Sequence, residues 1–251
     1  MGSMLWDAPV LLRKTSTMQC IADYVRSGYT CATQGVVAID RATAFVRKMR
    51  DHYLVHVGKD MRYRRKKMGL GNAALVLWQH DERVPALTWV LLVTPPELQH
   101  RHPAHALERL TDVTARRGRI TLDSYELVRA TRHGAMRPSG TWQPTRHATL
   151  RWRDRFADAI RRRDFVDLQR AWYSLHRMPG FAPIRKQAQQ IRGHARAEWK
   201  SSMGSSTFPC SNSRIWYVSR HAHEAVPLSA VVRRWAAPDT ASETQIEGHI
   251  L

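Results

Sequence analysis

Apolar residues near the start of the chain follow one strand pattern and then a helical pattern. The apolar run at residues 10–12 predicts a first strand. The spacing i, i+3, i+4 and i+7 then predicts an amphipathic helix with the buried stripe Met18, Ile21, Ala22 and Val25. Thr15 or Ser16 can cap this helix, and Gly28 is placed to end it.

A second helix and a strand are predicted next. Asp40 can cap a helix that carries Arg41 in its first turn and turns Phe45 and Met49 toward the core. Residues 53–57 are aromatic and β-branched, which favours a strand.

Two strands, a helix and a further strand are predicted in the middle of the chain. The strand patterns at 74–79 and 87–94 are separated by a turn at 81–85. A helix at 103–118 opens with a proline and is stopped by a glycine, and residues 120–130 are again extended. This order is a fragment of a ferredoxin-like sheet layer, so we expect an α+β fold.

The pattern becomes helical almost throughout residues 146–200, with a break at Met178-Pro179-Gly180. We interpret this segment as an inserted helical subdomain whose apolar stripes are self-contained, so that deleting it should leave a folded body. Residues 214–220 predict a strand that returns to the main sheet, and residues 226–235 predict a closing helix or strand.

Three regions follow from these patterns. We expect a ferredoxin-like α+β core with N-terminal helices at 4–140, an arginine-rich helical insertion at 141–202, and a return strand with a C-terminal tail at 203–251.

The charge of the chain indicates a polyanionic partner. The 251 residues include 40 Lys plus Arg against 21 Asp plus Glu, a formal charge of +19, and 43% of them are hydrophobic. A folded body of this composition carries its excess charge on the surface, where it attracts polyanions. No apolar stretch approaches the roughly 20 residues of a membrane span, and no signal-peptide pattern is present. Nucleic acid is therefore the expected partner, and a membrane is not.

The kinds of charged and sulfur-containing residue refine this expectation. Arginine far outnumbers lysine, and its planar guanidinium binds phosphate bidentately and stacks on bases, although a GC-rich genome would produce the same bias. The three cysteines Cys20, Cys31 and Cys210 form no C-x-x-C pair. We therefore expect no cofactor, no zinc site and no disulfide framework, in a protein of the reducing cytoplasm.

Two groups of basic residues are candidates for nucleic-acid binding. The run at 62–72, closed by glycines, predicts a loop that lines a nucleic-acid backbone or, alternatively, a solvated hairpin connection. The helical segment carries arginines off its apolar stripes, Arg146 and Arg153 among them, and predicts a clamp for a duplex or hairpin rather than an ordinary solvated face. The candidates are Arg62, Arg64, Arg65, Lys66, Lys67, Arg151, Arg155, Arg162, Arg163, Arg185, Lys186, Arg192, Arg196 and Lys200.

Histidine and tryptophan residues offer weaker signals. The pair His221 and His223 resembles the metal-binding histidines of HUH rolling-circle nucleases, with Tyr217 or Tyr173 as a nucleophile. Phosphate contact or simple exposure is the favoured interpretation of this pair, so we predict no metal site. The tryptophans are expected in the core, and Trp199 is the one we would test for stacking on a base.

The expected sheet layer, the helical insertion and the arginine-rich surface together resemble a CRISPR RNA-processing endoribonuclease of the RAMP superfamily. Within it, the type IV (Csf) form of plasmids and mobile elements is the most similar. The chain departs from better-known members in lacking an evident C-terminal glycine-rich loop. The resemblance implies that the partner is the repeat hairpin of precursor CRISPR RNA, together with other CRISPR effector subunits.

The resemblance also implies metal-independent cleavage beside the hairpin, with the protein staying bound to the mature guide RNA. The 2′-hydroxyl attacks the adjacent phosphate, and a cation must stabilise the phosphorane that forms. The resemblance places this site in the N-terminal helices, where Arg26 and Arg41 are the candidates and Asp23 or Tyr24 can orient them. Solvent-exposed helix arginines are the other interpretation of Arg26 and Arg41. The alternative function is a plasmid or mobile-element DNA-binding protein, either a replication or partition factor or an HUH-type nickase.

Overall fold

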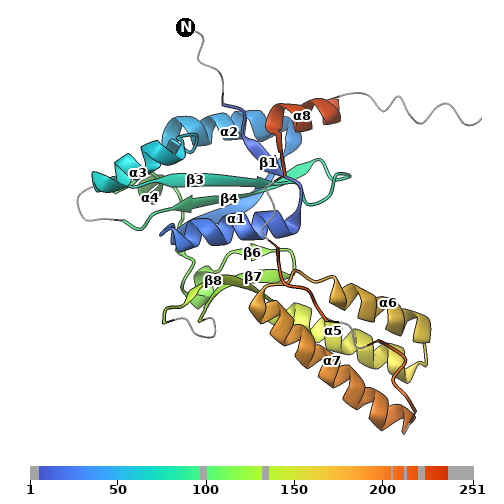
Figure 1. Cartoon of the computed structure of the whole chain (residues 1–251). Helices are drawn as coiled ribbons and strands as arrows, with labels where there is room; N and C mark the ends of the chain where they lie inside the picture. Colours follow the sequence, from blue (N-terminus) through green and yellow to red (C-terminus); the bar gives the residue numbers. More distant parts are fainter. Residues whose placement is uncertain are drawn as a thin grey trace, which may run out of the picture.

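A computed structural model gives the structure of the chain and describes residues 6–96, 101–131, 136–204, 206–211, 214–219 and 224–236. Figure 1 shows two β-sheets and a group of three helices arranged along one axis of the molecule.

The larger sheet, sheet A, has six strands in the order β5-β2-β4-β3-β1-β9. Strands β1 and β3 are parallel, and every other neighbouring pair is antiparallel. All six residues of β3 are apolar, and Thr88 is the one polar residue of β4, as expected for strands covered on both faces. The strands are β1 (Pro9–Leu11), β2 (Cys31–Ala38), β3 (Ala73–Trp78), β4 (Ala86–Val93), β5 (Thr111–Asp112) and β9 (Ala225–Pro227).

Helices cover both faces of sheet A. Helix α1 (Lys14–Arg26) packs its apolar stripe on one face, against Val76 and Leu92. Helix α2 (Ile39–Tyr53) and helix α8 (Leu228–Ala236) share a separate apolar cluster with Leu77 on the other face. The alternation of side chains along β3 therefore divides the core into two layers.

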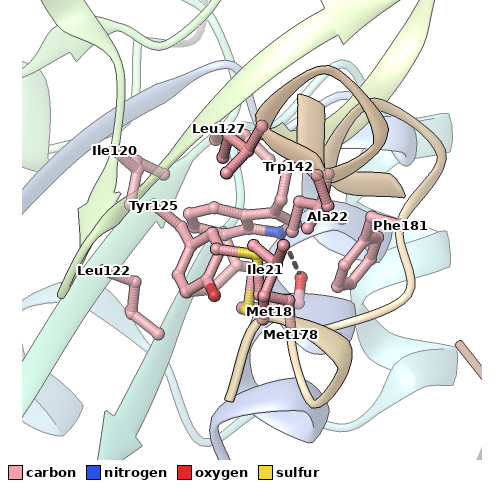
Figure 2. Packing of buried hydrophobic residues seen from close by; sticks show 14 of the residues in the cluster. Met18, Ile21, Ala22, Ile120, Leu122, Tyr125, Leu127, Trp142, Met178 and Phe181 are labelled. Carbon is pink, nitrogen blue, oxygen red and sulfur yellow. Dashed lines mark hydrogen bonds between the residues drawn. The ribbon is translucent and has the colours of Figure 1, made fainter. Parts of the chain in front are cut away.

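Sheet B is a three-stranded antiparallel sheet on the far side of α1, so this helix lies between the two sheets (Figure 1). Its strands are β6 (Thr121–Leu122), β7 (Tyr125–Ala130) and β8 (Ser139–Pro144). Trp142 of β8 is fully buried against α1, and its indole Nε1–H donates a hydrogen bond of 2.7 Å to the carbonyl oxygen of Met18 (Figure 2).

Three helices extend from sheet B. They are α5 (Arg146–Arg161), α6 (Phe165–His176) and α7 (Ala182–Met203). Thr145 caps α5 by accepting from the N–H of Ala148, and Asp164 caps α6 by accepting from the N–H of Asp167. Met178 and Phe181, which lie between α6 and α7, reach the same apolar cluster as Met18 and Trp142 (Figure 2).

The chain then returns past α6 and α7, and we call residues 206–211 and 214–219 the return segment. The indole N–H of Trp199 donates to the carbonyl of Ser206, and that of Trp172 donates to the carbonyl of Ser211, both at 2.9 Å. At the end of this segment, the side-chain amide of Gln19 on α1 donates to the carbonyl of Ser219 at 2.8 Å. Core tryptophans thus hold an irregular backbone in place by satisfying its carbonyls.

Several predictions are confirmed by these elements. The α+β class is correct, and α1 carries the predicted buried stripe. On α2, Met49 is buried as predicted and Phe45 is half-buried against the core. Strands β3 and β4 lie within one or two residues of the predicted ranges. The three helices of the segment 146–200 are present, with the break at Met178-Pro179-Gly180.

The expected ferredoxin-like arrangement is not what the element order shows. That layer has the order β-α-β-β-α-β, whereas here α2 and α3 (Lys59–Lys67) lie between β2 and β3, and helices cover both faces of sheet A. Residues 120–130 form β6 and β7 of sheet B instead of a strand of sheet A. Burial of Ile120, Leu122 and Leu127 in the apolar cluster that contains Met18 and Trp142 stabilises this arrangement.

Four local predictions were wrong. The basic run expected as a loop is mostly helix α3, because Arg62, Arg64 and Lys66 are good helix formers. Of the strand predicted at 53–57, Tyr53 is the last residue of α2 and the rest is a turn that begins at Leu54, the C-cap, in a left-handed conformation with φ 52°. The helix predicted at 103–118 is reduced to α4 (Ala104–Leu107) and a 3-10 turn (Arg116–Gly118) on either side of β5. Residues 214–219 are irregular, not a strand of the main sheet.

Candidate nucleic-acid interface

Helix α7 presents a basic stripe beside its buried one. Its buried stripe faces the core and consists of Ile184, Ala188, Ile191, Ala195 and Trp199. Arg185, Arg192 and Arg196 directly follow Ile184, Ile191 and Ala195 of this stripe. They fall on the same side of the helix because they are spaced by seven and four residues.

These arginines line a groove of about 680 Å³ between α7 and the return segment. We call it the α7 groove. The lining residues are Arg185, Gln189, Arg192, Gly193, Arg196, Arg214, Ile215 and Tyr217. Four arginines therefore face one hollow, and no Asp or Glu is among its described lining residues.

Aromatic rings hold three of the four guanidinium groups in place. That of Arg185 lies 3.5 Å from the ring centroid of Tyr217, and those of Arg192 and Arg196 lie 5.2 Å and 5.6 Å from the ring of Trp172. Burial, together with the neighbouring Arg196, lowers the pKa of Arg192. An anion in the groove would relieve this repulsion, so the geometry favours phosphate binding.

A second basic groove of about 600 Å³ lies on the other side of α7, against α5. Arg116, Arg119, Arg146 and Arg153 line it, and Glu126 is the acidic residue among its described lining. Glu126 accepts hydrogen bonds from Arg119 at 2.8 Å and from Gln143 at 2.6 Å, which offsets its charge. Helix α7 is thus flanked by cationic hollows on two sides.

The structure brings together only part of the predicted helical clamp. Arg185, Arg192 and Arg196 share the α7 groove, while Lys186 and Lys200 are exposed on α7 outside its lining. The candidates on α5 and just after it lie elsewhere and are exposed: Arg151, Arg155, Arg162 and Arg163. Arg155 is committed to an ion pair of 2.7 Å with Asp167, and Arg162 donates to the carbonyl of Asp158.

The basic helix α3 divides into structural and exposed residues. Arg62 donates to the hydroxyl of Tyr24 at 2.9 Å and to the carbonyl of Val55 at 3.0 Å. Arg65 donates to the carbonyl of Gly71 at 2.8 Å, so both half-buried arginines hold α3 to its neighbours. Arg64, Lys66 and Lys67 are exposed and remain candidates for nucleic-acid contact.

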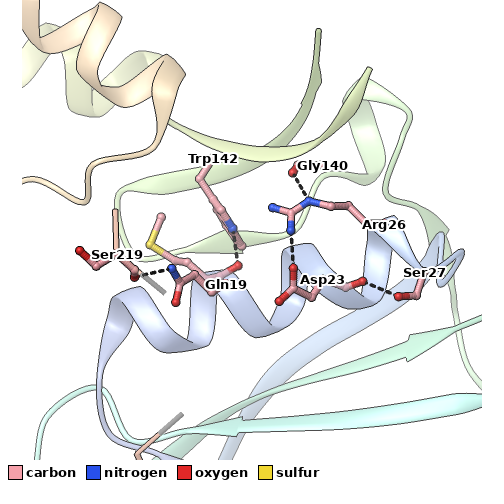
Figure 3. A network of polar contacts seen from close by, with 8 residues as sticks. Gln19, Asp23, Arg26, Ser27, Gly140, Trp142 and Ser219 are labelled. Carbon is pink, nitrogen blue, oxygen red and sulfur yellow. Dashed lines mark hydrogen bonds and ion pairs between the residues drawn. The ribbon is translucent and has the colours of Figure 1, made fainter. Parts of the chain in front are cut away.

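The two catalytic candidates lie on opposite faces of sheet A. Arg26 ends α1, whereas Arg41 is exposed in the first turn of α2. One phosphate cannot contact both, so the structure does not assemble them into one site. Figure 3 shows Arg26 on the side of α1 that faces sheet B, ion-paired with Asp23 and donating to the carbonyl of Gly140 at 3.3 Å. Tyr24 contacts Arg62 instead of orienting Arg26.

The predicted stacking residue is buried. Trp199 is only 6% exposed, because it packs in the core between Phe165 and Phe208. Trp216 and Tyr217, which stand beside the α7 groove, are 84% and 74% exposed. Their adjacency in the sequence could have predicted an exposed aromatic residue. Neighbouring residues of a strand point to opposite faces, so even the strand predicted there would have turned one of the two rings outward.

Arg214, Arg116 and Arg119 also line grooves but were absent from the predicted set. They lie outside the arginine-rich segment in the sequence, and only the path of the chain brings them to α7. No sequence pattern marks that path.

Metal binding and membrane insertion find no support in the part of the chain that the structure describes. His221 and His223 lie outside the described residues. Within them, no group of three or more His, Cys, Asp or Glu side chains is placed to hold a metal ion. Every described helix is too short or too polar to cross a lipid bilayer.

Comparison of the chain with protein-family models, with curated proteins and with solved structures gives no match.

Proposed function

We propose that this protein binds hairpin RNA across helix α7, with the backbone of one strand in the α7 groove and that of the other in the groove beside α5. The observation that carries this proposal is the α7 groove itself, where four arginines line one hollow without a described acidic neighbour. Two cationic hollows flanking one helix suit the two phosphate backbones of a duplex stem, which RNA-binding proteins contact by shape and charge.

The activity that we propose is metal-independent cleavage of the bound RNA beside its hairpin, as in the CRISPR RNA-processing endoribonucleases of the RAMP superfamily. The arginine-rich helices support this proposal. The strand order of sheet A does not, because it differs from the ferredoxin-like order expected for that superfamily. After cleavage the protein keeps the product, a guide RNA, because the grooves contact the hairpin rather than the scissile bond.

Arg26 is the arginine that we propose for stabilising the phosphorane. Contacts with Asp23 and the carbonyl of Gly140 fix its guanidinium, and a preorganised cation stabilises developing charge at little reorganisation cost. Gln19, which holds the end of the return segment, lies seven residues earlier on the same side of α1, about 10 Å along the helix. RNA that leaves the α7 groove along the return segment is therefore directed toward Arg26. Arg41, on the far side of sheet A, has no such relation to either groove.

The test is single-turnover cleavage of a repeat-hairpin RNA in EDTA, at saturating protein. Wild-type protein should cleave, and a 2′-deoxy substitution at the scissile nucleotide should abolish cleavage. Arg26→Ala should cleave about 10²–10³-fold more slowly with little change in RNA affinity. Arg41→Ala is the matched control and should cleave at the wild-type rate.

Four outcomes would count against the proposal. Absence of cleavage in EDTA would remove the nuclease activity, and absence of hairpin affinity would remove the binding function as well. Nicking of single-stranded DNA only with manganese would favour the HUH-type alternative. Equal rates for both alanine variants and wild type would place the catalytic site away from Arg26.

A further inference from the structure

Trp216 and Tyr217 place two neighbouring aromatic rings in solvent at the edge of the α7 groove. They are 84% and 74% exposed, and Tyr217 lines the groove directly. Burying an aromatic side chain is one of the larger favourable contributions available to a folding chain. Two adjacent rings left exposed beside a ligand groove therefore indicate a binding surface.

The backbone that carries these rings is fixed on both sides of them. Ile215 and Val218 pack against the hydrophobic core, so the residues before and after the pair point inward. The N–H of Val218 donates to the carbonyl of Gly180 at 3.2 Å, and the carbonyl of Ser219 accepts from Gln19. The rings are thus presented by an ordered backbone, which reduces the entropy lost when a ligand binds.

The surroundings of the rings are cationic. The guanidinium of Arg185 lies 3.5 Å from the ring centroid of Tyr217, and Arg214 lines the groove from the return segment itself. An apolar protein surface would have to desolvate these charges to cover the rings. A polyanion that carries flat, stackable groups matches both features at once, and single-stranded nucleic acid has this chemistry.

We infer that Trp216 and Tyr217 form a stacking platform for unpaired bases of the RNA whose backbone lies in the α7 groove. The inference rests on the proposed function and specifies its substrate further: an RNA with unpaired nucleotides next to the paired stem. Arg185 extends the stack, because a guanidinium plane packs on an aromatic ring much as a base does.

The experiment compares two oligomers of equal phosphate number, an oligouridine and an oligomer of the same length without bases. Fluorescence anisotropy should show that wild-type protein binds the oligouridine roughly tenfold more tightly than the abasic oligomer. Trp216→Ala should remove most of that preference and leave the affinity for the abasic oligomer unchanged. Tyr217→Ala should also remove most of the preference, but it should weaken binding of both oligomers as well, because Arg185 loses the ring that holds its guanidinium in the groove. Trp216→Phe, which keeps a flat ring, should retain most of the preference.

Tyr173→Ala is the matched control. Tyr173 is also exposed, at 63%, and also carries an arginine over its ring, with Arg177 5.5 Å from the centroid, but it lies on α6 outside the α7 groove. Its loss should leave both affinities at the wild-type values. The urea midpoints of the Trp216 and Tyr217 variants should also match wild type, because the rings are exposed.

The outcomes separate this inference from the proposed function. Equal wild-type affinity for the two oligomers would overturn the stacking platform but would not contradict phosphate binding in the α7 groove. Equal losses for both oligomers in Trp216→Ala would show that Trp216 only supports the groove, which also overturns the inference. Failure of wild-type protein to bind either oligomer or the hairpin would overturn the proposed function itself.

Discussion

Gly180 is the residue at which the return segment meets the helices. A methyl group at its Cα would lie 2.0 Å from the carbonyl oxygen of Trp216 and 2.6 Å from the backbone nitrogen of Val218. Both of these neighbours are backbone atoms, so they cannot turn aside as a flexible side chain can. The absence of a side chain at Gly180 thus allows the backbone that carries Trp216 and Tyr217 to pack directly against it.

Gly180→Ala should therefore displace the return segment. We expect the free energy of unfolding to fall by about 1–3 kcal/mol, the usual cost of overpacking. We also expect the preference for oligouridine to weaken as the two rings move. Urea denaturation and the anisotropy assay measure these effects.

Gly193→Ala is the stability control for that substitution. A Cβ at Gly193, in the middle of α7, meets no atom within 4 Å, and alanine is the better helix former. This variant should gain about 0.5–1 kcal/mol. Equal urea midpoints for the two alanine variants would contradict the role assigned to Gly180.

At the scale of elements, α1 shows what the sequence could and could not predict. The stripe of Met18, Ile21, Ala22 and Val25 was evident from its spacing and is buried as expected. Sheet B also packs on this helix, where Trp142 donates to a backbone carbonyl of α1 and Gly140 lies beside Val25. A backbone contact leaves no signature in the helical sequence, so the second layer was not predictable.

The same limitation affected the candidate site. The arginines of α7 were predictable from their position beside the buried stripe, and they do line a groove. The partner residue Arg214 was not, because the return segment is held by carbonyls that accept from Trp172 and Trp199. Likewise, no pattern along the chain indicates that Arg26 and Arg41 belong to opposite faces of one sheet.

The continuous core changes the expected result of deleting the helical segment. Phe156, Ile160 and Phe181 belong to the same apolar cluster as Trp142 and Met18, so the stripes of α5–α7 are not self-contained. Replacing residues 146–204 by a short linker should therefore expose sheet B and α1, and cooperative unfolding in urea should be lost. A sharp two-state transition for the shortened chain, with intact near-ultraviolet dichroism, would show that the remainder folds alone.

At the scale of the whole molecule, the formal charge of +19 is spread over every layer, from α2 and α3 to α5 and α7. Such a field accelerates the approach of any polyanion but does not position it. Position comes from places where several cations converge on one hollow without acids, and the α7 groove is such a place. Binding governed by the general field and binding in the α7 groove are therefore expected to respond differently, in their dependence on salt, to the loss of particular arginines.

The salt dependence of hairpin binding distinguishes them. Each phosphate neutralised by a bound cation releases counterions, so the slope of log affinity against log salt is about −0.7 to −0.9 per contact. The double variant Arg185→Gln with Arg214→Gln removes two groove contacts and should make this slope shallower by about 1.4–1.8. Arg41→Gln with Arg47→Gln removes the same charge from exposed positions on α2, so its slope should stay near the wild-type value. Anisotropy titrations between about 50 and 200 mM salt measure all three slopes. Equal changes in both double variants would mean that net charge, and not the α7 groove, governs binding.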